Sequence, residues 1–171
     1  YELLTRSVRR LLSHQDDEGR LSTYDKAREF QGWDLWGRKY VMVGLQYYLD
    51  VCRDEALAER VKAAFIRHSD YIVDHIGPKS EGKIPITTTS THWDGVNSSS
   101  ILKAFVVMYR LTGRQRYLDF ARTILEEGGM EHFHLFRAAY ENRLAPYEYP
   151  VTKAYETISC FEGALELYKV T

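Results

Sequence analysis

The chain has little that would tie it to a membrane, a nucleic acid or a disulfide scaffold. Only two of its 171 residues are cysteines, Cys52 and Cys160, which is too few for a disulfide-stapled fold. We expect both to be largely buried free thiols. The formal net charge is −1, so no basic surface is expected that would attract a nucleic-acid backbone or an anionic membrane. A neutral or small-molecule partner is the expectation that remains.

Several sequence signals are also missing. No uninterrupted apolar run approaches the length needed to span a bilayer, and no charged-then-apolar leader opens the chain at Tyr1. There is no serine elbow, no phosphate-binding glycine loop and no dinucleotide fingerprint. We therefore expect a soluble chain without nucleotide chemistry, and its cellular location stays open.

The chain does contain a repeat. Three stretches run from an aromatic-carboxylate pair into an apolar segment that closes on a tyrosine: Trp33-Asp34 to Tyr48, Trp93-Asp94 to Tyr109, and Tyr155-Glu156 to Tyr168. The closing tyrosines lie 61 and 59 residues apart (109 − 48 and 168 − 109). This period suits a helical hairpin followed by one long functional loop.

The spacing of apolar residues predicts broadly apolar inner helices that alternate with single-faced outer helices. A first helix is expected over residues 1–14. The inner helices are expected over 37–51, 101–112 and from 156 to the end, and the outer helices over 55–76 and 117–127. On the last inner helix, the side chains expected to face inward are Ile158, Phe161, Ala164, Leu165 and Tyr168.

These elements predict an all-α fold, made of about two and a half helical hairpins of an (α/α)6-type toroid. The long loops 79–97 and 130–152 have room for short strands and are expected to be functional. We expect residues 1–171 to form a single domain that is a portion of a larger α/α-barrel, because the third hairpin lacks its outer helix. Stacked hairpins bury their faces only against neighbours, so the open flank favours self-association.

Each inner helix is entered through a carboxylate beside an aromatic residue. If the hairpins are arranged radially, Trp33, Asp34, Trp93, Asp94, Tyr155 and Glu156 come together on one rim, joined by Trp36, His92 and Asn97. Aromatic faces stack on sugar rings, while carboxylates bind hydroxyl groups and supply acid, base or nucleophile. The rim therefore predicts binding of an oligo- or polysaccharide. The alternative is that the three acids only cap or precede their helices.

The third loop offers further candidates. Glu141 and Glu148 lie among tyrosines, and a carboxyl group in such surroundings suits a general acid, although both could equally be solvated loop residues. His92, His132 and His134 would bind a metal only with partners from elsewhere in the chain, and ordinary loop histidines are the simpler interpretation.

Three segments resemble the β-L-arabinofuranosidase-type glycoside hydrolases, formerly a domain of unknown function: Gln15 to Tyr24, Gly95 to Ala121, and Pro150 to Leu167. The resemblance implies an (α/α)6 barrel of which this chain covers about half. It further implies that Glu141 is the acid/base and that Glu156-Thr157 opens a Glu-Thr-Cys motif that helps to bind zinc. Ile158 stands where that cysteine belongs and Cys160 comes two residues late, while the nucleophilic cysteine would lie beyond Thr171. We therefore expect no cofactor and assign no metal ligands, with zinc as an open alternative.

The favoured interpretation is a glycoside hydrolase fragment with Glu141 and Glu156 as catalytic carboxylates. Two alternatives stay open. The same toroid could carry an unsaturated-glycuronyl hydrolase, for which Asp34 and Asp94 would supply paired aspartates, or a sugar epimerase. It could also be a non-enzymatic helical-repeat module that binds a protein or glycan.

Overall fold

The structure is a computed structural model that describes all residues from Tyr1 to Thr171, and it is all-α, as predicted. The α-helices are α1 (Glu2–Leu12), α2 (Asp34–Val51), α3 (Glu55–His75), α4 (Val96–Ser99), α5 (Leu102–Thr112), α6 (Gln115–Glu126), α7 (Leu135–Glu141) and α8 (Ala154–Tyr168). Short 3-10 turns lie in the connections: η1 (Lys79–Glu81), η2 (Ile86–Thr88), η3 (His92–Gly95) and η4 (Pro146–Glu148). None of the helices has the length and apolar content that a membrane crossing requires.

The long loops contain no strands, so the expectation of short strands is not met. Two isolated bridges form instead, between Ile76 and Ile84 and between Gly129 and His134. In the first loop, Pro85 has no N–H group for a strand ladder, and the chain turns directly into η2 after it. Tight turns thus take the place of extended pairing in this loop.

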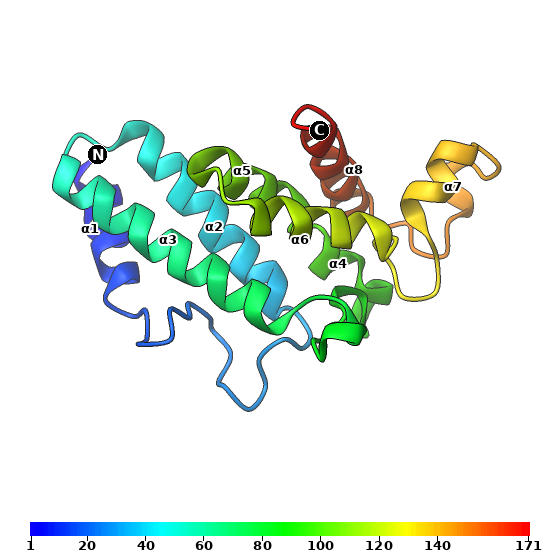
Figure 1. Cartoon of the computed structure of the whole chain (residues 1–171), viewed down its shortest axis with the longest axis horizontal. Coiled ribbons are helices and arrows are strands. Elements are labelled where there is room, and N and C mark those ends of the chain that lie inside the picture. Colours follow the sequence, from blue (N-terminus) through cyan, green and yellow to red (C-terminus); the bar gives the residue numbers. More distant parts are fainter.

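Two helical hairpins, α2–α3 and α5–α6, form the body of the molecule (Figure 1). The predicted cap at Asp54 is present, since its Oδ1 accepts a hydrogen bond of 3.0 Å from the N–H of Leu57 in the first turn of α3. The predicted stop at Gly113 is present too, where a left-handed φ of 66° ends α5. Local sequence signals therefore locate both hairpins correctly.

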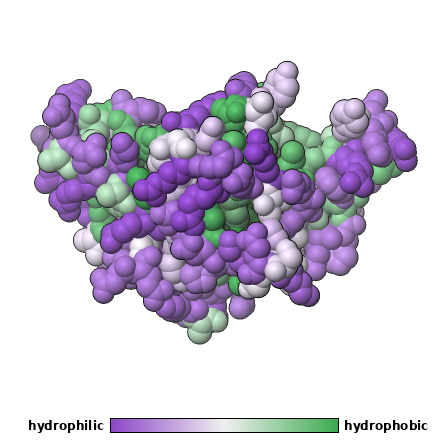
Figure 2. Space-filling model, viewed as in Figure 1, coloured by the Kyte–Doolittle hydropathy of each residue, from purple (hydrophilic) through white to green (hydrophobic).

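The core lies between these hairpins. Its largest cluster includes Leu45 from α2, Phe65 from α3, Phe105 from α5 and Tyr117 from α6, all fully buried. The outward surface of α3 and α6 is mostly hydrophilic in the view of Figure 2, with small apolar patches between the polar side chains. An inner and an outer layer of helices thus pack through one apolar interface, as the alternation of broad and single-faced patterns predicted.

α8 continues the inner layer, but with a different face inward from the one predicted. Ile158, Leu165 and Tyr168 are 64%, 54% and 80% exposed, whereas Cys160 and Gly163 are buried against α4 and α5. A β-carbon on Gly163 would lie 2.7 Å from Leu102 Cγ, so this glycine permits the close approach of α8 to α5. The prediction of the inward face was therefore wrong for Ile158, Leu165 and Tyr168, whereas Phe161 and Ala164 do pack against the apolar clusters. The buried side of the helix also includes Cys160, Gly163 and Leu167.

α7 was not predicted, since residues 130–152 were expected to be a loop. His134 precedes this short helix and its Nδ1 accepts a hydrogen bond of 3.3 Å from the N–H of Arg137. Asn142 ends the helix in the left-handed conformation, with φ 51°. Figure 1 shows α7 projecting from the body beside the start of α8. Beneath it lies a second, smaller apolar cluster that includes Met130, Leu135 and Tyr149.

Candidate functional site

The N-terminal ends of α2, α4 and α8 converge, as the repeat predicted. Asn97 of α4 donates a hydrogen bond of 3.0 Å from Nδ2 to the carbonyl oxygen of Gly32, just before α2. Cys160 of α8 lies 3.7 Å, from Sγ, from the carbonyl oxygen of Val96. Contacts between side chains and backbone thus bring together segments that are more than 60 residues apart.

Aromatic side chains gather at this convergence and form what we call the aromatic rim: Trp33, Trp36, Tyr40, His92 and Tyr155. Trp33 stacks on His92, with ring centroids 6.1 Å apart and planes inclined by 15°. Trp36 contacts the other members edge to face, with centroid distances of 5.9 Å to Trp33, 5.3 Å to Tyr40 and 5.4 Å to Tyr155. The hydroxyl groups of Tyr40 and Tyr155 are hydrogen-bonded to each other.

Trp93 and Asp94 lie at the edge of this region, and their side chains contact different partners. Both adopt left-handed backbone conformations, with φ 58° and 54°. Trp93 is 44% exposed and has the Nζ of Lys153 4.6 Å from its ring centroid. Asp94 instead accepts hydrogen bonds from His132, 2.7 Å from Nδ1 and 3.1 Å from the backbone N–H. Its carboxylate is therefore engaged with the third loop.

Gly95 explains how this strained turn is held. It has φ 81°, and a β-carbon there would lie 2.1 Å from the carbonyl oxygen of Thr87. Any other residue would push η3 away from η2 and so displace the start of α4. A glycine is required here both for the backbone conformation and for the close approach.

The residues that could hold a cation are Asp94, Glu131 and His132, whose ligand atoms lie within 4.8 Å of one another. The Asp94 carboxylate raises the pKa of the His132 imidazole.

Cys160 is not available as a metal ligand in the same way, because burial raises its pKa to about 12 and keeps it a protonated thiol at neutral pH. Ile158, which replaces the cysteine of the resembled zinc motif, is exposed on the far side of α8.

The two predicted catalytic carboxylates have different surroundings. Glu141 lies in the last turn of α7 with its side chain 35% exposed, and its Oε2 is 3.4 Å from Nε of Arg143. Glu156 lies in the first turn of α8 and is only 4% exposed, directly after Tyr155 of the aromatic rim. No hydrogen bond or shared ion-pair partner joins the two. Of the pair, Glu156 is the one at the convergence of helix ends.

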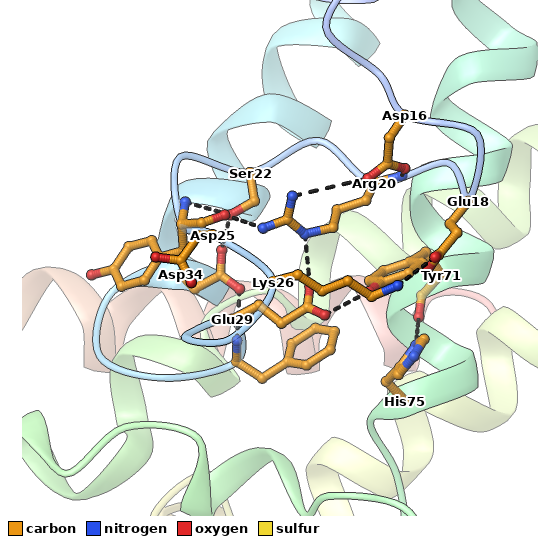
Figure 3. Close-up of polar contacts among 12 residues, drawn as sticks. Asp16, Glu18, Arg20, Ser22, Asp25, Lys26, Glu29, Asp34, Tyr71 and His75 are labelled. Carbon is orange, nitrogen blue, oxygen red and sulfur yellow. Dashed lines mark hydrogen bonds and ion pairs between the residues drawn. The ribbon is translucent and has the colours of Figure 1, made fainter.

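Asp34 does not face the rim, because its side chain belongs to a buried ion network. It is 2% exposed and accepts hydrogen bonds from the N–H of Phe30 (2.8 Å), from Nε of Arg38 (3.0 Å) and from the hydroxyl of Ser22. Figure 3 shows Ser22 and Asp34 together at one end of this network. The expectation that Asp34 binds sugar is corrected by this placement, since its oxygens are used inside the fold.

Glu29 forms the centre of the same network, and sequence patterns did not single it out. Its carboxylate accepts hydrogen bonds from Nε of Arg20 (2.8 Å), from a guanidinium nitrogen of Arg38 (2.7 Å) and from the hydroxyl of Tyr71 (2.6 Å). Figure 3 shows Glu29 between Arg20 and Tyr71. Arg20, Glu29, Asp34, Arg38 and Tyr71, which we call the Arg38 network, thus fasten the segment before α2 to α2 and α3.

Lys39 is a second functional candidate that sequence patterns missed. Only 7% of it is exposed, and its Nζ lies 4.6 Å, 5.4 Å and 5.3 Å from the ring centroids of Trp36, Tyr40 and Tyr155. Its single hydrogen-bond partner is the hydroxyl oxygen of Ser100, at 3.3 Å. Burial lowers the pKa of the Lys39 ammonium to about 8.

A cavity of about 140 Å³ opens beside Lys39 between α2, α5 and α8. We call it the Lys39 cavity; its polar lining includes Lys39, Tyr40, Ser100, Lys103, Tyr155, Ser159 and Glu162. In α4 and the first turn of α8, several buried side-chain oxygens have no hydrogen-bond partner: Asn97 Oδ1, Ser98 Oγ, Ser99 Oγ and Thr157 Oγ1. Unsatisfied buried polar atoms are uncommon in proteins, and their concentration here is typical of a site that takes up water or a ligand.

The convergence of α2, α4 and α8 is thus the candidate site, with an exposed aromatic edge and a buried polar interior. No protein-family model, curated protein or solved structure matches this chain. Any assignment of function therefore rests on the geometry described above and on the resemblance noted in the sequence.

Proposed function

We propose that the chain binds an oligo- or polysaccharide at the aromatic rim and is part of a glycoside hydrolase of the β-L-arabinofuranosidase type, with the helical hairpins belonging to an α/α-toroid. The observation that carries the proposal is the joining of Trp33, Trp36 and Tyr155 at the converging helix ends. Tyr155 is 57% exposed, so its ring is available to stack on a sugar face.

Polar groups around the rings support a sugar ligand over a purely apolar one. The hydroxyl of Tyr155 and the ring nitrogens of the exposed His92 lie at the edge of the rim and can exchange hydrogen bonds with sugar hydroxyls. The exposed ring of Trp93, with Lys153 beside it, offers a second stacking surface near the same helix ends. Rings combined with a few hydrogen-bonding groups are what saccharide recognition requires.

Glu156 is the proposed catalytic carboxylate at the rim, and Glu141 is its proposed partner from α7. Glycoside hydrolysis needs two carboxyl groups on either side of the scissile bond. Glu156 directly follows Tyr155, so a sugar stacked on that ring would lie close to the start of α8. Glu141, at the end of α7, would supply the second carboxyl group.

The first test is calorimetric titration with a panel of arabino-, galacto-, xylo- and gluco-oligosaccharides. We expect Trp33→Ala and Tyr155→Ala each to weaken binding about 2- to 12-fold, from 0.5–1.5 kcal/mol of ring contact. Tyr168→Ala is the matched control, because Tyr168 is also an exposed tyrosine of α8, 80% exposed, but lies at the other end of the helix. Absence of binding to every saccharide would overturn the proposal.

The second test separates an enzyme from a binding module. Release of 4-nitrophenol from aryl arabinofuranosides, glucuronides and related glycosides should be abolished by Glu156→Gln and reduced by Glu141→Gln. Saccharide binding without any hydrolysis would indicate a binding module instead of an enzyme.

The exposed apolar residues Ile158 and Leu165 on α8 also predict self-association, which sedimentation would reveal as a species heavier than the 20.0 kDa chain.

A further inference from the structure

Lys39 combines burial, missing charge partners and access to a cavity. It forms no ion pair, and of its three N–H donors only one has a hydrogen-bond acceptor, the Ser100 hydroxyl. That hydroxyl itself donates to the carbonyl oxygen of Asn97 at 2.6 Å, so it is fixed as an acceptor toward Lys39. Both Lys39 and Ser100 line the Lys39 cavity, which places the amine at its wall.

We propose that Lys39 is a nucleophilic amine whose Nζ forms a Schiff base with a small neutral aldehyde, such as the open-chain form of a short aldose, in the Lys39 cavity. Desolvated lysines in partly apolar pockets are the usual source of such amines. This activity goes beyond the proposed saccharide binding. It shares Tyr40 and Tyr155 with the aromatic rim but needs neither a glycan nor hydrolysis.

The surrounding charges favour a neutral carbonyl over an anion. Glu156 and Glu162 of α8 both lie close enough to raise the pKa of Lys39, against the larger effect of burial. The same carboxylates would repel an anionic ligand at this amine. The charge of Lys103 in α5 lowers the pKa of Lys39, but Lys103 is itself paired with Glu162, with 2.6 Å between Nζ and Oε1.

The tyrosine pair of the rim offers the protons that the reaction needs. The hydroxyls of Tyr40 and Tyr155 bond each other beside Lys39, and burial raises the pKa of Tyr40 to about 12, so it stays protonated at neutral pH. Nζ bonds to the carbonyl carbon, the carbonyl oxygen takes one proton, the nitrogen releases one, and a neutral carbinolamine results. The carbinolamine then loses its hydroxyl as water with a second proton, and the nitrogen gives up its own proton to leave the imine.

The test traps this imine in the folded chain. Glycolaldehyde with sodium cyanoborohydride as hydride donor converts each imine into a hydroxyethyl-amine, which peptide mass mapping assigns to a residue. At pH 7.5 roughly a quarter of an amine with pKa 8 is neutral, against about 0.1% of an ordinary lysine. We expect Lys39 to be modified at least about tenfold faster than Lys103, which lines the same cavity, and than the exposed Lys79.

The rate of modification should rise with a midpoint near pH 8. The titratable groups that face the amine are Tyr40, Lys103, Tyr155, Glu156, Cys160 and Glu162. Burial raises the pKa of Cys160 and that of Tyr40 to about 12 each, above the range in which Lys39 titrates. The pH profile between 6.5 and 9 therefore reports on Lys39 itself.

Three variants sharpen the result. Lys39→Arg should remove the label from its peptide and leave the rest unchanged, and Lys79→Arg, at an exposed lysine outside the cavity, should leave Lys39 labelling intact. Trp33 does not contact Lys39, so Trp33→Ala should weaken saccharide binding while the labelling of Lys39 persists. This result would separate the present inference from the proposed function. In urea the selectivity should vanish. Labelling of Lys39 in the folded wild-type chain no faster than that of Lys79 would overturn the inference, whether or not any variant folds.

Discussion

Arg38 and Lys39 are adjacent in α2 and both are buried cations, yet their surroundings differ. Arg38 is 1% exposed and bonds the carboxylates of Asp34 and Glu29 directly. Lys39 is 7% exposed and has one hydroxyl and three aromatic rings around it. The first cation is neutralised within the fold and fastens a loop. The second lacks a carboxylate partner and lines a cavity, which is the arrangement expected of a group available for chemistry.

The largest effect should come from removing Arg38. Arg38→Met leaves Glu29 and Asp34 buried without their shared cation, and we expect the free energy of unfolding to fall by about 3–5 kcal/mol. Urea unfolding followed by circular dichroism measures this. A loss below about 1 kcal/mol would mean that the Arg38 network does not hold the segment before α2.

The second effect concerns His68, which borders the Arg38 network and accepts the N–H of Leu21 at Nδ1 (3.1 Å). Burial lowers its pKa to about 3, with Arg38 adding to the shift, so the folded state keeps it neutral. Below pH 6.5 the unfolded chain binds a proton that the folded chain does not. Stability should therefore fall as pH drops, by about 2–3 kcal/mol between pH 6.5 and 4.5.

His68→Asn is the matched control for this pH dependence, because its amide oxygen can accept the same N–H without titrating. The variant should lose less stability over that pH interval than the wild-type chain, whatever its stability at pH 7. Equal slopes for both proteins would show that His68 is not the group responsible.

The third effect has the same physical origin as that of His68, but it concerns Lys39. Its folded pKa of about 8 lies below the ordinary value of 10.5, so between these values the unfolded chain binds more protons than the folded one. Stability should thus rise with pH, by about 1–2 kcal/mol between pH 8 and 9.5. Unfolding of the wild-type chain and Lys39→Met at both pH values gives the difference. A parallel pair of curves would contradict the assignment.

The smallest effect is that of Lys39→Met at pH 7. No carboxylate loses a direct partner, and methionine fills the space between the rings of Trp36 and Tyr155, so we expect stability to decrease by no more than about 1 kcal/mol. Arg38→Met and Lys39→Met introduce the same residue at adjacent positions of α2, so the difference between their stabilities tests the comparison most directly. Similar losses of stability for both variants would contradict the distinction between the two cations.

Much of the fold could be predicted from the sequence, because local rules decide where helices begin and end. Asp54 accepts the first N–H groups of α3, and Gly113 takes the left-handed conformation that ends α5. α7 escaped prediction because it is short and begins at a histidine, which is an unusual cap. In the candidate site, the repeat together with an assumed radial arrangement of the hairpins predicted that Trp33, Trp36, His92, Asn97 and Tyr155 would come together, and the structure brings these helix ends together.

Only the tertiary structure decided which polar side chains are used up inside the fold and which stay available. From the sequence Asp34 is expected to be an accessible rim acid, but the segment before α2 folds over it, so that Ser22, Phe30 and Arg38 take up its oxygens. The sequence does not distinguish Lys39 from an ordinary helix lysine. In the structure it is a buried amine, because α5 and α8 pack over it. Helix ends and faces depend on neighbours within a few positions along the chain. The burial, the ion pairs and the pKa values of side chains depend on groups that only folding brings together. The tertiary structure therefore determined the chemical properties of this site.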